Sequence, residues 1–295
     1  MSAPSGPSPA GSASSAGSLR EARLARPAAS PASRSPSIGK LRSLLGGTFA
    51  MAQAELRKLH HDHLDIFTRS VQPLLWLFIF GTALHHNRSL TVGTLDYRSY
   101  LAPGVMAQAA MFIAIFFGLA VIWERDVGQL QRLLATPLPR SAIVLGKAAG
   151  ACVRALVQAL LLLAVLAVTG IAVRWTATGL IGTLALLLLG TGAFACMSML
   201  LAAAVKERER FMGIGQLVMM PLFFASSALY PLAVMPAWLH AIARVNPLTY
   251  EVQGLRQMLV GVGGAGEVWI DFAVVIGFFA IMLAAATRAY PKAIL

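Results

Sequence analysis

Six long runs of apolar residues dominate the chain, and most of its charged residues lie in the segments between them. A helix needs about 20 apolar residues to cross the hydrocarbon core of a bilayer. Because each run is close to this length, the pattern predicts an all-α polytopic membrane protein with six transmembrane helices. Their expected limits are 66–84, 99–123, 151–173, 179–204, 212–232 and 268–289.

An amphipathic helix is predicted just before the first span, over residues 48–66. Phe49, Ala52, Leu56 and Leu59 recur there at spacings of three and four, with charged residues between them. A basic amphipathic helix beside a span is expected to lie in the cytoplasmic interface of the membrane. The His-rich run at 60–63 is not predicted to bind a metal, because four adjacent helical residues cannot all point at one ion.

A second amphipathic segment lies between the second and third spans. Leu130, Leu133 and Leu134 form an apolar ridge, and Pro137 and Pro139 end the helix. The charged residues around the ridge make this segment too polar to enter lipid. Such a helix can dock into a groove on a partner protein. It can equally be a simple interfacial helix, and periodicity alone leaves both interpretations open.

Composition supports the membrane interpretation and excludes several classes of protein. Apolar residues make up 57% of the chain and charged residues 12%, with a mean hydropathy of +0.71. A soluble domain is about 45–50% apolar and about 25% charged. A soluble enzyme, a disordered protein and a disulfide-stabilised secreted protein are therefore disfavoured. The two cysteines, Cys152 and Cys196, lie in apolar runs and are expected to be reduced packing residues.

The net charge of +12 predicts the orientation of the chain in the membrane. Most of the 24 Lys and Arg residues fall in the tail, the 124–150 loop, the 206–211 loop and the C-terminal end. The positive-inside rule therefore predicts that both termini are cytoplasmic. This asymmetry accounts for the basic excess without a nucleic-acid partner. Residues 1–47, rich in Ser, Pro and Ala, are predicted to be a disordered basic cytoplasmic tail. Five basic residues fall in segments predicted to be external: Arg88, Arg98, Arg174, Arg244 and Arg256.

The sequence lacks the motifs of an enzyme or of an autonomous motor. Neither of its Gly-Lys pairs, 39–40 and 146–147, belongs to a P-loop, so ATP would have to be hydrolysed by a separate chain. No nucleophile arrangement, paired-carboxylate site or metal motif is present. The predicted spans also lack an ionisable residue at mid-depth, which disfavours a carrier coupled to an ion or proton gradient.

Two segments resemble the signature of type-2 ABC exporter permeases, the class that includes daunorubicin-resistance and nodulation-factor exporters. The first runs from YLAPGV (Tyr100–Val105) to ERDVGQLQRLLATPLPRSAIVLGK (124–147). The second is SSALYPLAVMPAWLHAIARVNPLTYEVQGLRQML (226–259). The resemblance covers about residues 48–290 in the order of spans, and its loop motif is the more specific of the two.

This resemblance implies a transmembrane domain over 48–295 that pairs with a second permease chain, expected to be an identical copy. Two copies of an ATP-binding-cassette ATPase would bind beneath the pair and hold ATP and Mg, with no cofactor on this chain. The implied location is a prokaryotic inner membrane, in contact with lipid. The helix at 48–66 would be the interfacial helix, and the turn KERER (206–210) would also face the ATPase. The implied coupling positions are Glu124, Arg125, Gly128, Leu130, Arg132, Leu133, Leu134, Thr136, Pro137 and Arg140.

The resemblance also implies short re-entrant helices on the outer side, between the fifth and sixth spans. Pro231, Pro236 and Pro247 divide this segment, and Trp238 is an interfacial aromatic residue. VMPAWLHAIARV fits a short helix with Trp238, Ile242 and Val245 on one face. Asn246 is expected either to cap a helix or to break one before the next proline. We interpret Arg256 as reaching lipid headgroups, in preference to substrate.

The leading hypothesis is therefore the permease subunit of an ATP-driven exporter of a hydrophobic drug, lipid or lipid-linked glycan. One alternative is a gradient-driven carrier or channel, which transport by the chain alone would support. Another is a membrane assembly subunit that binds an ATPase and transports nothing.

Overall fold

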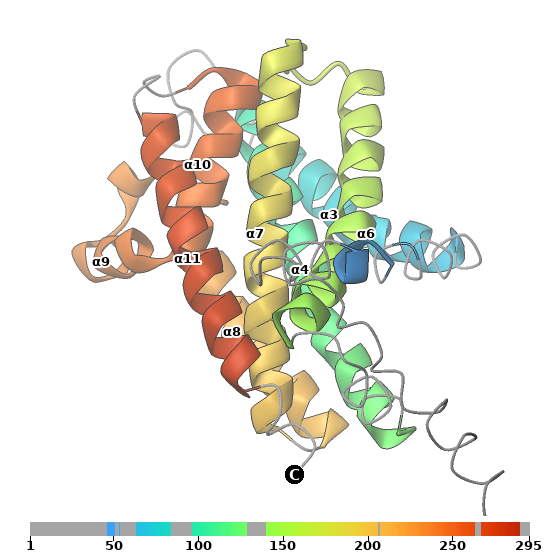
Figure 1. The fold of residues 1–295 in the computed structure, drawn as a ribbon. Coiled ribbons are helices and arrows are strands. Elements are labelled where there is room, and N and C mark those ends of the chain that lie inside the picture. Colours follow the sequence, from blue (N-terminus) through green and yellow to red (C-terminus); the bar gives the residue numbers. More distant parts are fainter. Residues whose placement is uncertain are drawn as a thin grey trace, which may run out of the picture. The chain divides into compact units, whose positions relative to one another are not determined.

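A computed structural model describes residues 46–50, 53, 63–83, 96–128, 140–205, 207–262 and 267–289. These residues form helices and their connections, with no strand among them (Figure 1). The prediction of an all-α protein is confirmed for this part of the chain. The helices are α3 (His63–Ala83), α4 (Tyr97–Asp126), α6 (Arg140–Val168), α7 (Ala177–Ala204), α8 (Arg208–Phe224), the 3-10 turn η2 (Leu232–Val234), α9 (Ala237–Val245), α10 (Pro247–Val260) and α11 (Glu267–Ala289).

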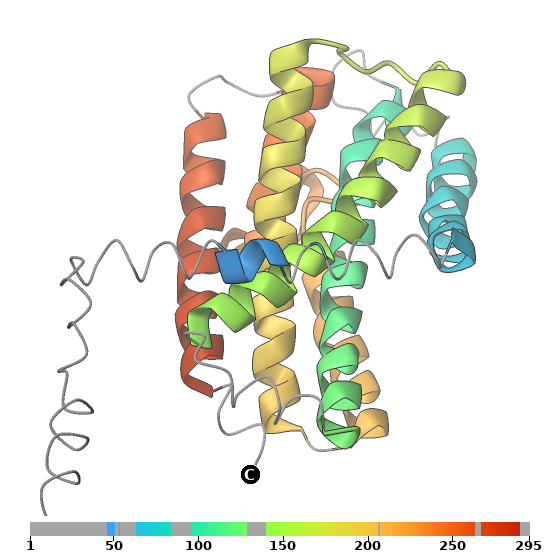
Figure 2. The same cartoon turned by 45° about the vertical axis from the view of Figure 1, so that its right-hand side comes forward.

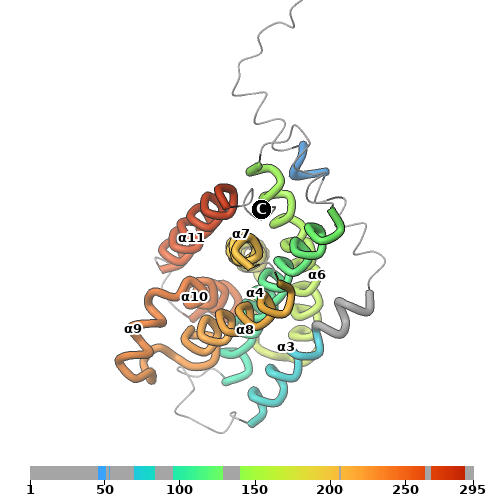
Figure 3. Tube along the Cα trace, turned by 90° about the horizontal axis from the view of Figure 1, so that it is seen from below, coloured from blue at the N-terminus to red at the C-terminus, as the bar shows by residue number. Residues whose placement is uncertain are grey.

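Helix α7 lies at the centre of the bundle and contacts α4, α6, α8, α10 and α11 (Figure 3). It is apolar on all sides, as expected for a helix with neighbours all around it. Thr176 begins it, because the threonine hydroxyl accepts a hydrogen bond from the amide of Gly179. Helices α4 and α11 run alongside α7, whereas α3 packs on α4 and α6 (Figure 2).

A small-residue contact brings α4 and α7 close together. The hydroxyl of Ser198 on α7 donates to the carbonyl of Ile115 and accepts from the amide of Gly118, 3.0 Å away. A Cβ atom at Gly118 would meet Ser198 and lie 2.7 Å from the ring of Phe211. Small residues allow such close approach between membrane helices. The absence of a side chain at Gly118 is therefore required by the packing.

Gly118→Ala is expected to destabilise the protein by about 2 kcal/mol, because the added methyl group overpacks this contact. Gly277→Ala on α11 is the matched control, since a Cβ there meets nothing within 4 Å. Alanine is the better helix former, so the control should be neutral or slightly stabilising. Thermal stability of the two variants in detergent checks this, and equal midpoints would contradict the requirement for glycine.

Four of the described helices, α4, α6, α7 and α11, are long and apolar enough to cross a membrane. They correspond to the predicted second, third, fourth and sixth spans. The other two predicted spans are represented by shorter helical segments: the apolar residues Ser70–Ala83 of α3, and α8, which has 17 residues and begins with three charged ones. Part of the predicted interfacial helix is also visible, because residues 46–50 and 53 are helical. The rest of 48–62 lies outside the described residues.

Two of the predicted spans had wrong boundaries. Helix α6 begins at Arg140, although the sequence analysis placed a loop up to residue 150. Its first turns carry Arg140 and Lys147, which lowered the local hydropathy, although Ile143, Val144 and Lys147 itself are buried. Helix α8 ends at Phe224 instead of continuing to residue 232. The chain turns there because Ala228 packs its backbone against Gly104 of α4, where any side chain would clash.

The outward surfaces of α3, α8 and α11 are apolar. Such surfaces would be unfavourable in water but suit contact with lipid chains or with another apolar helix. Together with the four long apolar helices, they identify a multi-pass membrane protein. Examples of these exposed side chains are Leu75, Ile79, Leu217, Trp269 and Ile281.

Candidate functional site

The predicted coupling segment follows the end of α4, and a glycine determines where that helix ends. Gly128 has φ = 72°, a left-handed conformation that favours glycine. Its amide donates to the carbonyl of Arg125, and the amide of Val127 donates to that of Trp123. This is a common way to end a helix. Gly128 therefore stops α4 and directs the chain toward residues 129–139, which lie outside the described residues.

A buried ion pair joins the end of α4 to the first turns of α6. The ammonium group of Lys147 contacts a carboxylate oxygen of Glu124. Lys147 is 3% exposed and Glu124 is 18% exposed, so the lysine has little water to stabilise its charge. The sequence analysis identified Glu124 as a coupling position and missed its partner, because Lys147 was assigned to a loop. In the structure the two residues join the last turn of α4 to the early part of α6.

The Glu124–Lys147 pair is expected to show an asymmetric response to substitution. Glu124→Gln should cost about 2 kcal/mol, because it leaves a buried ammonium group without its partner. Lys147→Met should cost less, since the remaining carboxylate is partly hydrated. The double variant should recover part of the loss, which thermal stability in a double-mutant cycle measures. Additive losses in the cycle would show that the two groups do not interact.

The start of α8 is attached to the same end of α4. Both Nε and Nη2 of Arg208 donate to one carboxylate oxygen of Asp126, at 3.0 and 2.8 Å. The guanidinium also stacks on the ring of Trp123, with its carbon 3.9 Å from the ring centroid. An exposed ion pair alone contributes little, but the cation–π contact adds to it. Arg208 belongs to the predicted ATPase-facing turn 206–210. In the structure its side chain contacts α4 through Asp126 and Trp123.

The structure therefore places three of the predicted coupling residues together at the end of α4 and a fourth at the start of α6. Glu124 and Arg125 lie in the last turn of α4, Gly128 ends it, and Arg140 is the exposed first residue of α6. Helix α4 is joined here to α6 by Glu124–Lys147 and to α8 by Asp126–Arg208. Six predicted coupling residues lie outside the described residues: Leu130, Arg132, Leu133, Leu134, Thr136 and Pro137.

The predicted outer region contains a helix cap. Asn246 accepts a hydrogen bond from the amide of Leu248, and Pro247 occupies the first position of α10. The asparagine amide also donates to the carbonyls of Leu222 at 2.7 Å and Ala225 at 3.0 Å. Of the two roles left open by the sequence, capping is the one observed. Asn246 also ties the start of α10 to the end of α8.

Other residues predicted for the outer region begin and line a short helix. Pro231 precedes η2, and Pro236 precedes α9 at Ala237. Trp238 on α9 is 66% exposed, and Ile242 and Val245 are exposed as well. This helix therefore presents an apolar face that the rest of the described chain does not cover.

Our interpretation of Arg256 as a headgroup ligand was wrong. Arg256 is 5% exposed, and its Nη2 donates to the carbonyl of Ser227 at 2.8 Å. Its Nε donates to the carbonyl of Tyr100 at 3.3 Å, and the guanidinium lies over the Tyr100 ring at 3.7 Å. The hydroxyl of Tyr97 donates to the neighbouring carbonyl of Leu229 at 2.9 Å. These contacts fix the 226–229 turn against α4, so Arg256 acts inside the fold.

The sequence analysis found no ionisable residue at mid-depth in the predicted spans, but a helix outside those spans places an acid beside the middle of α7. Glu251 on α10 is 1% exposed, and its carboxylate lies against Gly190 near the middle of α7. Neither carboxylate oxygen has a hydrogen-bond partner among the described residues. The sequence analysis counted residue 251 in an external segment, whereas α10 packs back against α4, α7 and α11. The signal that could have revealed this is the apolar face of 248–259, with Leu248, Val252, Leu255 and Leu259 all buried.

The arrangement defines a helical membrane protein with two distinctive polar regions. One is a charged junction at the end of α4, formed by Glu124–Lys147 and Asp126–Arg208, and the other is a buried arginine clamp, formed by Arg256 at the 226–229 turn. The chain belongs to the ABC-2 type transporter family, whose model matches residues 47–260. The resemblance to type-2 ABC permeases is thereby confirmed.

Individual relatives are similar over much of their length. The ycf38 protein of Pyropia yezoensis is 31% identical over 64% of this chain and 65% of its own length. Nodulation protein J of Rhizobium leguminosarum bv. trifolii is 31% identical over 64% of this chain and 72% of its own. The daunorubicin resistance ABC transporter permease protein DrrB1 of Streptomyces coeruleorubidus is 23% identical over 88% and 95%. The chain thus spans just under two thirds of the ycf38 protein.

Proposed function

We propose that this chain is the permease subunit of an ATP-driven exporter that moves a hydrophobic drug, lipid or lipid-linked glycan out of the cytoplasm. One observation carries the proposal: the helices flanking residues 129–139 are joined to each other by Glu124–Lys147 and to α8 by Asp126–Arg208. A docking segment mounted in this way can pass the closure of an ATPase to three helices at once. Differential contacts in two states are what such coupling requires.

The complete transporter would contain two copies of this chain and two ATPase subunits that hold ATP and Mg. Each chain would cross a prokaryotic inner membrane six times, with α3 and α8 as its first and fifth spans and both termini cytoplasmic. Helices α9 and α10 would re-enter the membrane from outside. The exposed apolar face of α9 supports this placement, because it would be unfavourable in water.

Affinity purification from the native membrane in mild detergent tests the proposal. Mass spectrometry should find a stoichiometric P-loop ATPase, and the reconstituted complex should move an amphipathic solute only when ATP is hydrolysed. Transport that ignores ATP in a correctly paired complex would contradict export by an ATPase.

A gradient-driven carrier is the second candidate, and Glu251 favours it. A buried, unpartnered carboxylate at membrane depth is typical of proton-coupled transporters. Liposomes that contain this chain alone, with a pH gradient and no ATPase, distinguish the two functions. Solute movement that follows the gradient, and is lost in Glu251→Gln, would support the carrier.

A further inference from the structure

A pocket with a volume of about 280 Å³ opens beside the arginine clamp. It lies between the first turn of α4, residues 231–233 and helix α10, and it extends to Val262 and Glu267. Residues 231–233 and Val262 give it apolar surface, whereas α10 and Glu267 give it polar groups. An apolar pocket with a few polar groups is the usual form of a small-molecule site, and the volume is close to the roughly 300 Å³ of the smaller ones.

Arg256 reaches this pocket with the nitrogen that the clamp does not use. Its Nε and Nη2 donate to the carbonyls of Tyr100 and Ser227. Nη1 has no hydrogen-bond partner among the described residues, yet it keeps accessible surface although the side chain is only 5% exposed. Because Arg256 lines the pocket, that surface faces an occupant. Arg256 therefore serves the fold with two nitrogens and presents the third to the pocket.

The positive charge of Arg256 is not balanced by an acid. Among the described residues, Arg256 forms no ion pair, and its two partners are neutral carbonyls. A buried charge without an opposite charge is unfavourable. A negatively charged group in the pocket would relieve this, and a hydrogen bond between a guanidinium and a carboxylate is among the strongest in proteins.

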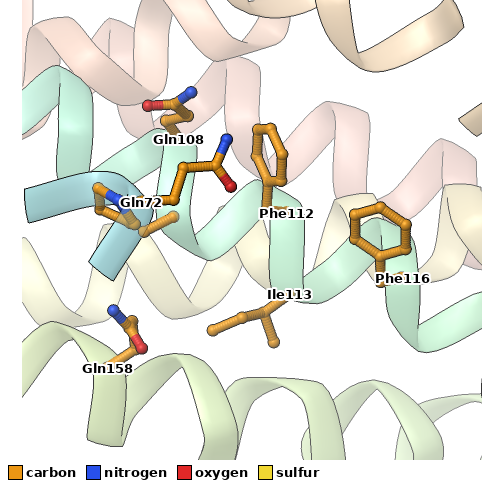
Figure 4. A pocket seen from close by; sticks show the side chains of 8 residues that line it. Gln72, Gln108, Phe112, Ile113, Phe116 and Gln158 are labelled. Atoms are coloured by element: carbon orange, nitrogen blue, oxygen red, sulfur yellow. The ribbon is translucent and has the colours of Figure 1, made fainter. Parts of the chain in front are cut away.

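A smaller pocket between α3, α4 and α6 differs in the access it gives to polar atoms (Figure 4). Gln108 and Gln158 line it, and each has one amide atom without a partner among the described residues. Those two atoms have essentially no accessible surface, so an occupant could not reach them. The pocket beside the clamp is the better candidate because Nη1 of Arg256 is accessible.

Gln253 supplies a second accessible polar group on the same wall. Its side chain lines the pocket, is half-buried, and forms no hydrogen bond with a described residue. Its amide can donate to an anion or accept from a hydroxyl group. Arg256 can only donate, so an occupant that uses both groups must carry at least one strong acceptor.

Glu267 limits how much negative charge the pocket accepts. Its carboxylate accepts a hydrogen bond from Nε2 of Gln257 at 3.2 Å, and the residue is exposed. One negative charge on an occupant is balanced by Arg256. A second negative charge would meet the carboxylate of Glu267 and gain no further cation from the described lining. The lining thus favours a monoanion over a dianion and over a neutral molecule of the same shape.

We propose that this pocket binds a small organic molecule with a single carboxylate. The carboxylate accepts from Nη1 of Arg256, and the apolar body of the molecule packs on residues 231–233 and Val262. Such a ligand contacts α4, α10 and the segment after the 226–229 turn at once, so it strengthens the clamp. The proposal concerns a binding site and does not rest on the proposed export function.

Thermal unfolding of the full chain in an uncharged detergent, titrated with benzoate, tests the proposal. A ligand that binds only the folded state raises the midpoint as its concentration rises. Benzoate should raise the midpoint in this way. Benzamide has the same ring and a neutral head, and it should need at least about a tenfold higher concentration, the effect of one lost charged hydrogen bond. Phthalate, a dianion, should also bind more weakly than benzoate.

Matched variants change the pocket and leave Arg256 in place, because Arg256 also holds the fold. Gln253→Met should weaken benzoate about fivefold, and Gln253→Glu should abolish its effect by adding a like charge. Glu267→Gln keeps an acceptor for Gln257 and removes the like charge, so it should tighten benzoate about two- to fivefold and phthalate more. Glu209→Gln makes the same change on the exposed side of α8 and should alter neither.

Several results would overturn the proposal. These are equal responses to benzoate and benzamide, a response that persists in Gln253→Glu, weaker or unchanged binding in Glu267→Gln, or no response at all. Each variant is compared with its own midpoint without ligand, so a loss of stability is not mistaken for a loss of binding. A complex that exports a solute with ATP but does not respond to benzoate would refute the site and leave the export function intact.

Discussion

Arg256→Met is expected to lower the free energy of unfolding by about 3–6 kcal/mol, a large fraction of the stability of most proteins. The substitution leaves the buried carbonyls of Tyr100 and Ser227 without their charged donor. It also removes the guanidinium from the face of the Tyr100 ring. Because these contacts hold the 226–229 turn on α4, the loss should be seen as a lower yield of folded protein and a lower thermal midpoint in detergent.

Two further variants make the Arg256 experiment specific. Arg244→Met applies the same change to an exposed arginine on α9 and should leave stability within about 0.5 kcal/mol of the wild type. Arg256→Lys keeps the charge, but an ammonium group cannot reproduce the planar two-carbonyl contact and the stacking, so it should rescue only part of the loss. Equal midpoints for Arg256→Met and Arg244→Met would show that the clamp does not stabilise the fold.

Leu133→Asp is expected to abolish co-purification of the ATPase and ATP-driven transport, while the chain still inserts and folds. The substitution places a charge on the predicted apolar ridge, and burying that charge in a partner groove would be costly. A central hydrophobic anchor contributes about 2 kcal/mol or more to an interface, so binding should weaken by at least about 30-fold. The ratio of ATPase to permease after affinity purification measures the effect.

The matched control for Leu133→Asp is Gln131→Asp, which adds the same charge at a neighbouring polar position. It should retain the ATPase, because position 131 lies off the predicted ridge. Retention of the ATPase by Leu133→Asp would instead identify the 129–139 segment as an interfacial helix without a docking role.

The long apolar helices were predictable because hydropathy reports exclusion from water, whether a side chain faces lipid or another helix. Helices α4, α7 and α11 lie where the apolar runs indicated, and both ends of each helix are within a few residues of the predicted limits. The start of α6 was missed because Arg140 and Lys147 interrupt the apolar run. A charged residue lowers hydropathy whether it faces water or, as Lys147 does, a carboxylate on another helix.

The roles of individual polar residues were harder to predict, because their partners lie far away in the sequence. Arg256 binds carbonyls of residues 29 and 156 positions distant. For Asn246 the sequence offered capping as one of two roles, because the partner of a cap, here Leu248, is only two residues away. Glu251 required the packing of α10 against α7, which no local pattern specifies. The inferred coupling positions between 129 and 139 remain predictions.

Helix α4 connects the two regions on which the proposed mechanism depends. Its last turn carries Glu124 and Asp126 of the charged junction, and its first turn carries Tyr97 and Tyr100 of the arginine clamp. Thirty helical residues span about 45 Å, which exceeds the thickness of the hydrocarbon core. One helix is therefore long enough to reach from one face of a membrane to the other. In the proposed orientation, a tilt of α4 caused by closure of the ATPase would move the 226–229 turn at its other end, so opening outside and closing inside would be a single mechanical event.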